Sequence, residues 1–451
     1  MVATSLSDDF VQALDQVLTH LVSGNYSEAR AAASAFRQTP GDHEPPEGPM
    51  MLAFEQWLST WDPVASTDKL VQTATADIDQ LTRCYAHLVV AFICSSEPRN
   101  LFSLQRAEYE ATQVIRSLDS ARGPLNIRVK VDGLHLQPWA AYWFRATART
   151  SLGRKAKALL DWQRAYSYAC PQKMPGAGQL TQEVQDDLSI TLLSYTSNPL
   201  IAKFLHDLAN YLVDVGDWGW DPEKRIKTYA GNGAKQFFEA SQKVGQDVGY
   251  SSPYLLADYA SFLSFARDEA AALQILAEAH ERVEQMRAGR EFSASGYCAS
   301  GRVYFQVGLL AYKFRHRHAL LIESRAPFGG PQRERLEAFE KGVADLPAGE
   351  FKNCFEDDYT GPLLLAHSAY MATRNPFRAI PCLILLADPL AARGEESCGI
   401  GARHLLWDLI YAMGTNFASG LTNYENLVGQ YFASDLIAGS REELLERSKV
   451  V

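Results

Sequence analysis

Residues 142–171 read YWFRATARTSLGRKAKALLDWQRAYSYACP, and this stretch decides the expected fold. Ala146 is small enough to let two helices cross closely, and Gly153 can take the left-handed conformation that ends a helix. Three residues spaced four and three apart share one face of the following helix: Ala158, Trp162 and Ala165. Pro171 then prevents that helix from continuing. The stretch therefore predicts a helix–turn–helix unit.

This order of small, turn, small, large and small positions resembles a tetratricopeptide repeat, a helical hairpin of about 34 residues. One such unit cannot bury its apolar face alone, so the resemblance implies an array of stacked neighbours. Proteins built from such arrays usually hold other proteins. An ordinary antiparallel helix pair in an all-α domain is the alternative.

Other segments fit the pattern less completely. The best of them is Pro253–Arg287, with Ala260 in its first helix and a second helix marked by Ala272, Leu276 and Ala279. Further copies are expected at 14–36 around Gly24, at 80–116, at 202–241 with an insertion from Gly219 to Gly233, at 307–327 and at 365–389. The sequence thus predicts an all-α, elongated, right-handed, tetratricopeptide-like α-solenoid of antiparallel helix pairs with loop insertions.

Three parts are expected along the chain. Residues 1–49 hold a helical repeat, which Ser7–Asp9 can cap, and a proline-rich loop at Thr39–Pro49. Residues 50–390 form the helical array, and residues 391–451 form a C-terminal helical cap whose polar end shields the stack. Only Asn126–Val131 alternates as a strand does.

Composition limits the class of protein. The chain has 451 residues, of which 47% are hydrophobic and 21% charged, as in ordered globular proteins. Its net charge of −10 argues against general nucleic-acid binding. Its longest apolar runs, Ala86–Cys94 and Ile380–Ala387, are shorter than the roughly 20 residues of a membrane span.

Cysteine use and the N-terminus favour a cytoplasmic location. The seven cysteines are dispersed, which predicts reduced and mostly buried thiols without a zinc site. The first residues lack the basic and apolar regions of a secretory signal. Neither a metal nor a cofactor motif is found, and no catalytic motif is found, so a non-enzymatic protein is expected.

The resemblance also supplies candidate binding residues. In chaperone-binding tetratricopeptide domains, lysines and asparagines on the first helices clamp the C-terminal carboxylate of a partner. Trp143 and Thr147 stand at those positions in this chain, and His206 precedes Asn210 in another repeat. A carboxylate clamp is therefore not expected. A groove lined by aromatic and hydroxyl side chains is expected instead, to hold a partner helix or peptide. Trp143 is its expected main anchor, and the further groove residues expected are Thr147, His206, Asn210 and Tyr254. A core position for Trp143 is the alternative.

A basic cluster, Lys313–His318, supplies two more candidates, Arg315 and Arg317. They can contact an acidic peptide, or they can be ordinary solvated helix surface. His316 and His318 are two residues apart and fall on different helix faces, which argues against a metal site.

These patterns predict a scaffold or adaptor that binds a partner protein or peptide, and possible self-association follows from the same surfaces. Two alternatives belong to other classes. A self-assembling helical structural protein, such as a viral coat, would share the composition. An all-α enzyme with an acidic cavity of dispersed carboxylates would leave little local trace in the sequence.

Overall fold

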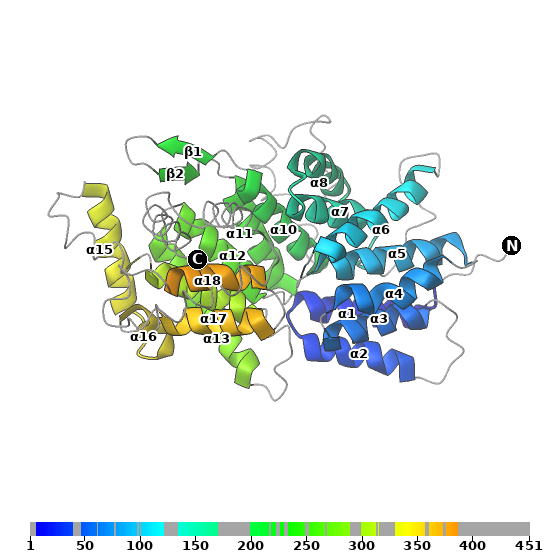
Figure 1. Cartoon of the computed structure of the whole chain (residues 1–451), viewed down its shortest axis with the longest axis horizontal. Coiled ribbons are helices and arrows are strands. Elements are labelled where there is room, and N and C mark those ends of the chain that lie inside the picture. Colours follow the sequence, from blue (N-terminus) through cyan, green and yellow to red (C-terminus); the bar gives the residue numbers. More distant parts are fainter. Residues whose placement is uncertain are drawn as a thin grey trace, which may run out of the picture. The chain divides into compact units, whose positions relative to one another are not determined.

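The computed structural model describes the following residues: 6–38, 47–60, 62–75, 78–96, 99, 101–120, 134–169, 199–215, 218–221, 226–229, 233–248, 252–266, 268–288, 299–312, 314, 330–356, 360–372 and 376–386. Within them the fold is helical apart from one short hairpin, as Figure 1 shows. The all-α prediction is therefore confirmed in its main point.

Helices dominate both halves of the chain. The N-terminal half contains α1 (Asp8–Val22), α2 (Tyr26–Gln38), α3 (Glu47–Thr60), α4 (Pro63–Ala74), α5 (Gln80–Ser95), α6 (Leu101–Ser120), α7 (Ala140–Ser151), α8 (Lys155–Ala169) and α10 (Pro199–Val215). The C-terminal half contains β1 (Trp218–Asp221), β2 (Ile226–Tyr229), α11 (Gly233–Val248), α12 (Pro253–Phe265), α13 (Glu269–Ala288), α15 (Gly330–Ala344), α16 (Glu350–Glu356), α17 (Thr360–Ala372) and α18 (Pro376–Leu386). A further helical stretch covers 299–312.

The chain divides into two compact units. Unit 1 holds α1 to α8, α10, α11 and the first residues of α12. Unit 2 holds the β1–β2 hairpin, the rest of α12, α13, the helix at 299–312 and α15 to α18.

The hairpin corrects the expectation that the insertion at Gly219–Gly233 is a plain loop. Strands β1 and β2 pair antiparallel, with Trp218 opposite Tyr229 and Asp221 opposite Ile226. Each strand has only four residues. A run of that length is too short for alternation to stand out in a sequence.

The hairpin predicted from residues 142–171 is present as α7 and α8. Ala146, Ala158 and Ala165 are fully buried. Gly153 has φ of 75° at the turn, and the amide of Arg154 donates to the carbonyl of Arg149 at 2.8 Å. This is the glycine-ended cap that satisfies the last carbonyls of a helix.

The hairpin of α1 and α2 repeats the same turn. Gly24 has φ of 80°, and the amide of Asn25 donates to the carbonyl of His20 at 2.8 Å. Ala29 and Ala33 of α2 are fully buried. Two hairpins far apart in the sequence thus use one turn geometry, and in both of them small residues occupy the helix contact.

Three of the other predicted pairs form hairpins as well. Helix α5 packs on α6, α10 on α11 and α17 on α18. The small residues of the segment at Pro253 are buried too: Ala260, Ala272 and Ala279. Three further predictions lie outside the described residues: the small residues at Ala319 and Ala326, the cap at 391–451 and the strand at Asn126–Val131.

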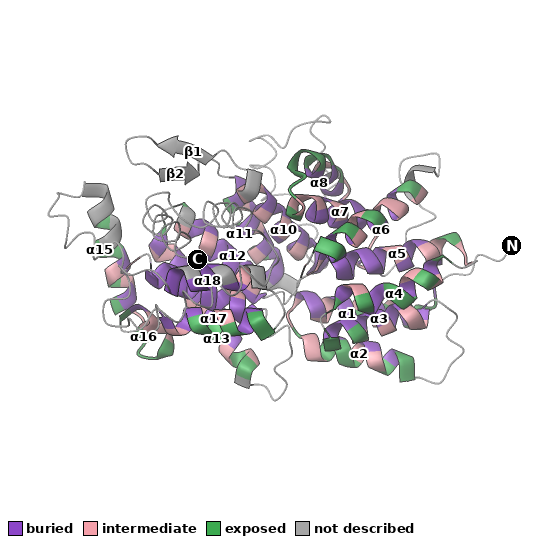
Figure 2. Cartoon of the chain, viewed as in Figure 1, coloured by how far each residue is buried: buried purple, intermediate pink, exposed green. Residues whose placement is uncertain are grey.

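The helices of unit 1 pack in sequence order. The first helices of successive hairpins also contact one another. Contacts join α3 to α5, α5 to α7 and α7 to α10, and α1 in turn contacts α10. Figure 2 shows α5 and α7 mostly in the colour of buried residues. Unit 1 therefore curves back on itself, which corrects the prediction of an elongated stack for this part of the chain.

The N-terminal loop ends earlier than expected. Ser7 caps α1 by accepting from the amide of Phe10 at 3.2 Å, as predicted. The amide and hydroxyl of Ser7 donate to the Glu47 carboxylate at 2.6 and 2.7 Å. Glu47 and Pro49 belong to the first turn of α3, where proline is well tolerated. The expected loop and domain limit at residue 49 therefore falls inside this helix.

Candidate functional site

Trp143 lies inside unit 1. Its side chain is 1% exposed and packs edge-on against Phe204 of α10, with ring centroids 5.8 Å apart. Its indole nitrogen donates to Oδ2 of Asp207 at 3.0 Å. Lys203 stands 5.7 Å from the ring centroid. The core position that the sequence left as the alternative is the observed one, because the first helices of unit 1 cover one another.

The other predicted groove residues are covered to different degrees. Thr147 and His206 are buried, and His206 packs near the ring of Phe238. Asn210 and Tyr254 are partly exposed. Arg315 and Arg317 lie outside the described residues. The structure therefore does not gather the predicted residues on one open surface of unit 1.

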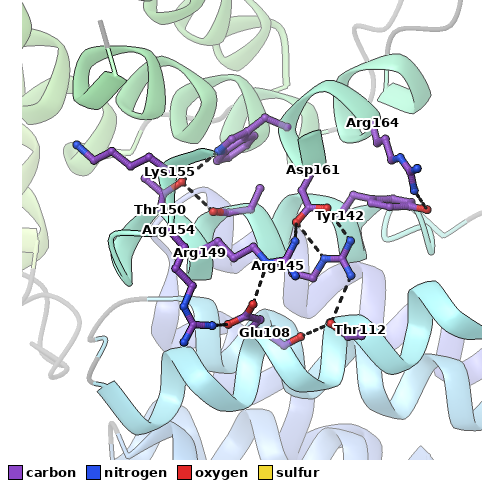
Figure 3. A network of polar contacts seen from close by, with 12 residues as sticks. Glu108, Thr112, Tyr142, Arg145, Arg149, Thr150, Arg154, Lys155, Asp161 and Arg164 are labelled. Atoms are coloured by element: carbon purple, nitrogen blue, oxygen red, sulfur yellow. Dashed lines mark hydrogen bonds and ion pairs between the residues drawn. The ribbon is translucent and has the colours of Figure 1, made fainter. Parts of the chain in front are cut away.

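A network of charged side chains joins α6, α7 and α8, as Figure 3 shows. Asp161 of α8, with a side chain 3% exposed, accepts from Nε and Nη2 of Arg145 at 3.0 and 2.6 Å. It also accepts from Nη1 of Arg149 at 2.7 Å. Bidentate pairing of this kind fixes geometry as well as energy. The two arginines thus hold α8 against α7.

Glu108 extends the network to α6. Its carboxylate accepts from Nε of Arg149 at 2.8 Å and from Arg154 in the turn before α8. Arg145 also reaches the hydroxyl of Thr112 on α6 at 3.4 Å. Helices α6 and α8 are therefore held on either side of α7 by the same arginines.

Basic residues outnumber acidic ones among the described side chains of these helices. Among the described side chains of 101–117 and 140–169 there are eight basic residues and three acidic ones. All three carboxylates are turned inward: Glu108 and Asp161 in the network, and Glu110 against His87 of α5, with Nδ1 and Oε2 2.5 Å apart. The basic side chains dominate what remains at the surface, in a chain whose net charge is −10.

The same helices expose large apolar side chains. On α6, Phe102 and Tyr109 are 72% and 62% exposed, and they lie seven residues apart on one face. On α8, Leu160 is 63% exposed, with Leu159 beside it. In unit 2, α17 exposes three more: Leu364, Leu365 and Met371. Large apolar side chains exposed on one helix face, such as Phe102 and Tyr109, are typical of interaction surfaces.

A second polar cluster lies in unit 2. Tyr304 donates to Glu284 of α13 and accepts from Nη1 of Arg287 at 2.7 Å. His280 packs against the rings of Tyr304 and Phe351. Burial lowers the pKa of His280 and, together with the bond to Glu284, raises that of Tyr304. The rings of His280 and Tyr304 are buried, whereas Glu284 and Arg287 are partly exposed, so the cluster ties α13 to its neighbours at the edge of the core.

Three of the four described cysteines are poor nucleophiles. Burial raises the pKa of Cys84 and of Cys94 to about 12 and raises that of Cys382 still further. Their thiols stay protonated at neutral pH, whereas the thiolate is the reactive form. The described cysteines are also free, and three of the four are buried, as the sequence predicts.

Comparison with known proteins gives no relationship: no protein-family model and no curated protein matches the chain. Among the described residues there is no group of three or more histidine, cysteine or acidic side chains placed to hold a metal ion. Within that same part of the chain, no helix combines the length and apolar character that crossing a bilayer requires.

Proposed function

We propose that this chain is a tetratricopeptide-like scaffold that binds a partner protein on the outer surfaces of α6 and α8. The observation that carries the proposal is the exposure of Phe102, Tyr109 and Leu160 on helices that are otherwise well packed. Each of these side chains would gain about 1.5–3 kcal/mol if a partner buried it fully. A few such anchors supply most of the affinity of an interface.

The repeat architecture supports the same proposal. Successive antiparallel hairpins with small residues at their contacts and left-handed glycines at two turns are what a tetratricopeptide array requires. The arginine network supports it further, because rigid helices lose little entropy when a partner binds. The proposed binding surface thus lies on α6 and α8, which are the second helices of their hairpins. It replaces the aromatic groove that was expected on the first helices.

Affinity purification from cells tests the proposal with one double variant. We expect Phe102→Ser combined with Leu160→Ser to lose a defined set of the partners that the unaltered protein captures. Arg30→Glu, at an exposed position of α2, should keep them. An identical partner set for all three proteins would contradict the proposal, and so would large regular particles of the purified protein in light scattering, which would favour a structural coat.

A further inference from the structure

One stripe of α8 combines an exposed leucine with two cations. Lys157, Leu160 and Arg164 follow one another at spacings of three and four, so they share one side of the helix. All three side chains are exposed. We call these three residues the α8 stripe.

The carboxylate of α8 itself does not reach the surface. Asp161, which follows Leu160, is turned inward and bound by Arg145 and Arg149. Asp161 is the only acidic residue in α8. The α8 stripe therefore meets the solvent as an apolar side chain flanked by positive charge.

The start of α8 breaks a general rule of helix design. The helix begins with Lys155 and continues with Lys157, and it has no acidic residue in its first turn. Arg154, which precedes the helix, is already paired with Glu108. Cations at a helix N-terminus oppose the helix dipole and cost about 0.3–1 kcal/mol each. Local conflicts of this kind tend to mark functional positions. Negative charge supplied by a partner would relieve the unfavourable interaction between these lysines and the helix dipole.

We propose that the α8 stripe is the docking site for an acidic amphipathic helix of a partner protein. This inference rests on the proposed function and names the chemistry of the partner. An apolar side chain of the partner covers Leu160, while glutamates or aspartates on both sides of it meet Lys157 and Arg164. Complementary charge of this kind raises the association rate and selects the partner, and burial of the leucine supplies affinity.

The arginine network gives this stripe a fixed position. Arg145 and Arg149 hold the helix through Asp161, and the ring of Tyr142 on α7 lies 5.5 Å from the guanidinium of Arg164. A partner helix therefore meets a surface whose leucine and cations already stand in register. The net charge of −10 repels acidic chains elsewhere on the molecule, which adds selectivity for this stripe.

Fluorescence anisotropy with two synthetic peptides tests the proposal on the full chain. The first peptide is a labelled amphipathic helix of about four turns with a leucine stripe flanked by glutamates, and the second replaces every glutamate by lysine. We expect the first to bind more weakly as salt rises and the second not to bind. Leu160→Ser and Lys157→Glu should each weaken binding about tenfold, while Arg30→Glu should leave it unchanged. Helix α2, which carries Arg30, lies on the opposite side of unit 1 from α8 (Figure 1).

If something other than an acidic helix covers the α8 stripe, these experiments give different results. Equal binding of both peptides, or binding that Leu160→Ser leaves intact, overturns the proposal. So does a dimer of the unaltered protein that Leu160→Ser makes monomeric in ultracentrifugation, because a second copy then covers the stripe. Sedimentation with vesicles rich in phosphatidylserine, without peptide binding, assigns the stripe to a membrane surface instead.

The proposed function and this inference can fail separately. If the double variant loses its cellular partners while Lys157→Glu keeps them, α6 and α8 bind proteins but the acidic helix is wrong. If no variant changes the captured partners, the proposed function fails first. Circular dichroism and urea unfolding of each variant confirm that these exposed substitutions leave the fold intact.

Discussion

Arg145 and Asp161 form a bidentate ion pair between neighbouring helices, with both guanidinium–carboxylate distances at or below 3.0 Å. The pair connects the buried interior of unit 1 to the surface stripe proposed as its docking site. Since Arg149 shares the same carboxylate, the position of α8 depends on a small set of charges.

Asp161→Ala should destabilise unit 1 strongly. The substitution leaves two partly buried guanidiniums without their shared carboxylate, and breaking such a pair costs about 3–5 kcal/mol. Urea unfolding measures this change. Lys235→Ala, which removes an exposed pair with Glu239 at 3.9 Å, is the matched control and should change stability by less than about 1 kcal/mol. A small effect for Asp161→Ala would show that the network does not hold α8.

Trp143→Ala should act on folding. The side chain is buried against Phe204 and bonded to Asp207, so its removal should lower the free energy of unfolding by about 3–5 kcal/mol. Thermal or urea unfolding measures the loss. Tyr109→Ala, an exposed aromatic on α6, should change stability by about 0.5 kcal/mol or less. An alanine variant of Trp143 that keeps its stability and loses only partners would restore the groove interpretation.

Gly308→Ala should disturb unit 2 by collision. A Cβ atom at residue 308 would lie 2.6 Å from both Cγ and Cδ2 of Leu363, which is fully buried on α17. Overpacking of this kind costs about 1–3 kcal/mol. Adding Leu363→Ala should then cost less than the sum of the two single changes, by about 1 kcal/mol, in a double-mutant cycle. Gly342→Ala, which meets only the flexible end of Leu273, is the control, and strict additivity would refute the collision.

His280 should make stability depend on pH. Burial lowers its pKa below the ordinary 6.5, against the opposing influence of Glu284 and Glu350, and Arg287 lowers it further. The unfolded chain therefore binds the proton more readily than the folded chain. This contribution to stability is complete above the ordinary pKa and is lost as pH falls below about 6.5 toward the lowered pKa of the folded chain.

His280→Phe keeps a ring against Tyr304 and Phe351 and removes the titration. The slope of stability against pH between about 7 and 5 should become shallower in this variant. Some slope should remain, because burial also lowers the pKa of His367. An unchanged slope would show that His280 takes up its proton equally well in the folded chain.

Local structure was predictable where a single residue type decides it. Gly24 and Gly153 mark turns because the left-handed backbone excludes other residues, and Ala158 and Ala165 mark helix contacts because larger side chains do not fit. The cap at Ser7 follows from its hydroxyl alone. Such signals are contained within one or two turns of chain.

The packing of segments that are far apart in the sequence was not predictable in the same way. Trp143 fits a groove or a core equally well in the sequence, and the contact of α1 with α10 decides between related packings of the same hairpins. The inward turn of Asp161 depends on two arginines of the preceding helix, and it leaves the exposed cations of α8 without a carboxylate from the same helix. These outcomes depend on how hairpins stack, which repeat spacing does not encode.

The contact between α1 and α10 also governs how unit 1 forms on the ribosome. The first hairpin emerges early, yet the surface that α1 offers to α10 stays uncovered until residues 199–215 have been made. At about 5–20 residues per second this interval is on the order of ten seconds or more. During that time α2 already packs on α1, but the face of α1 that later meets α10 has no partner from the same chain.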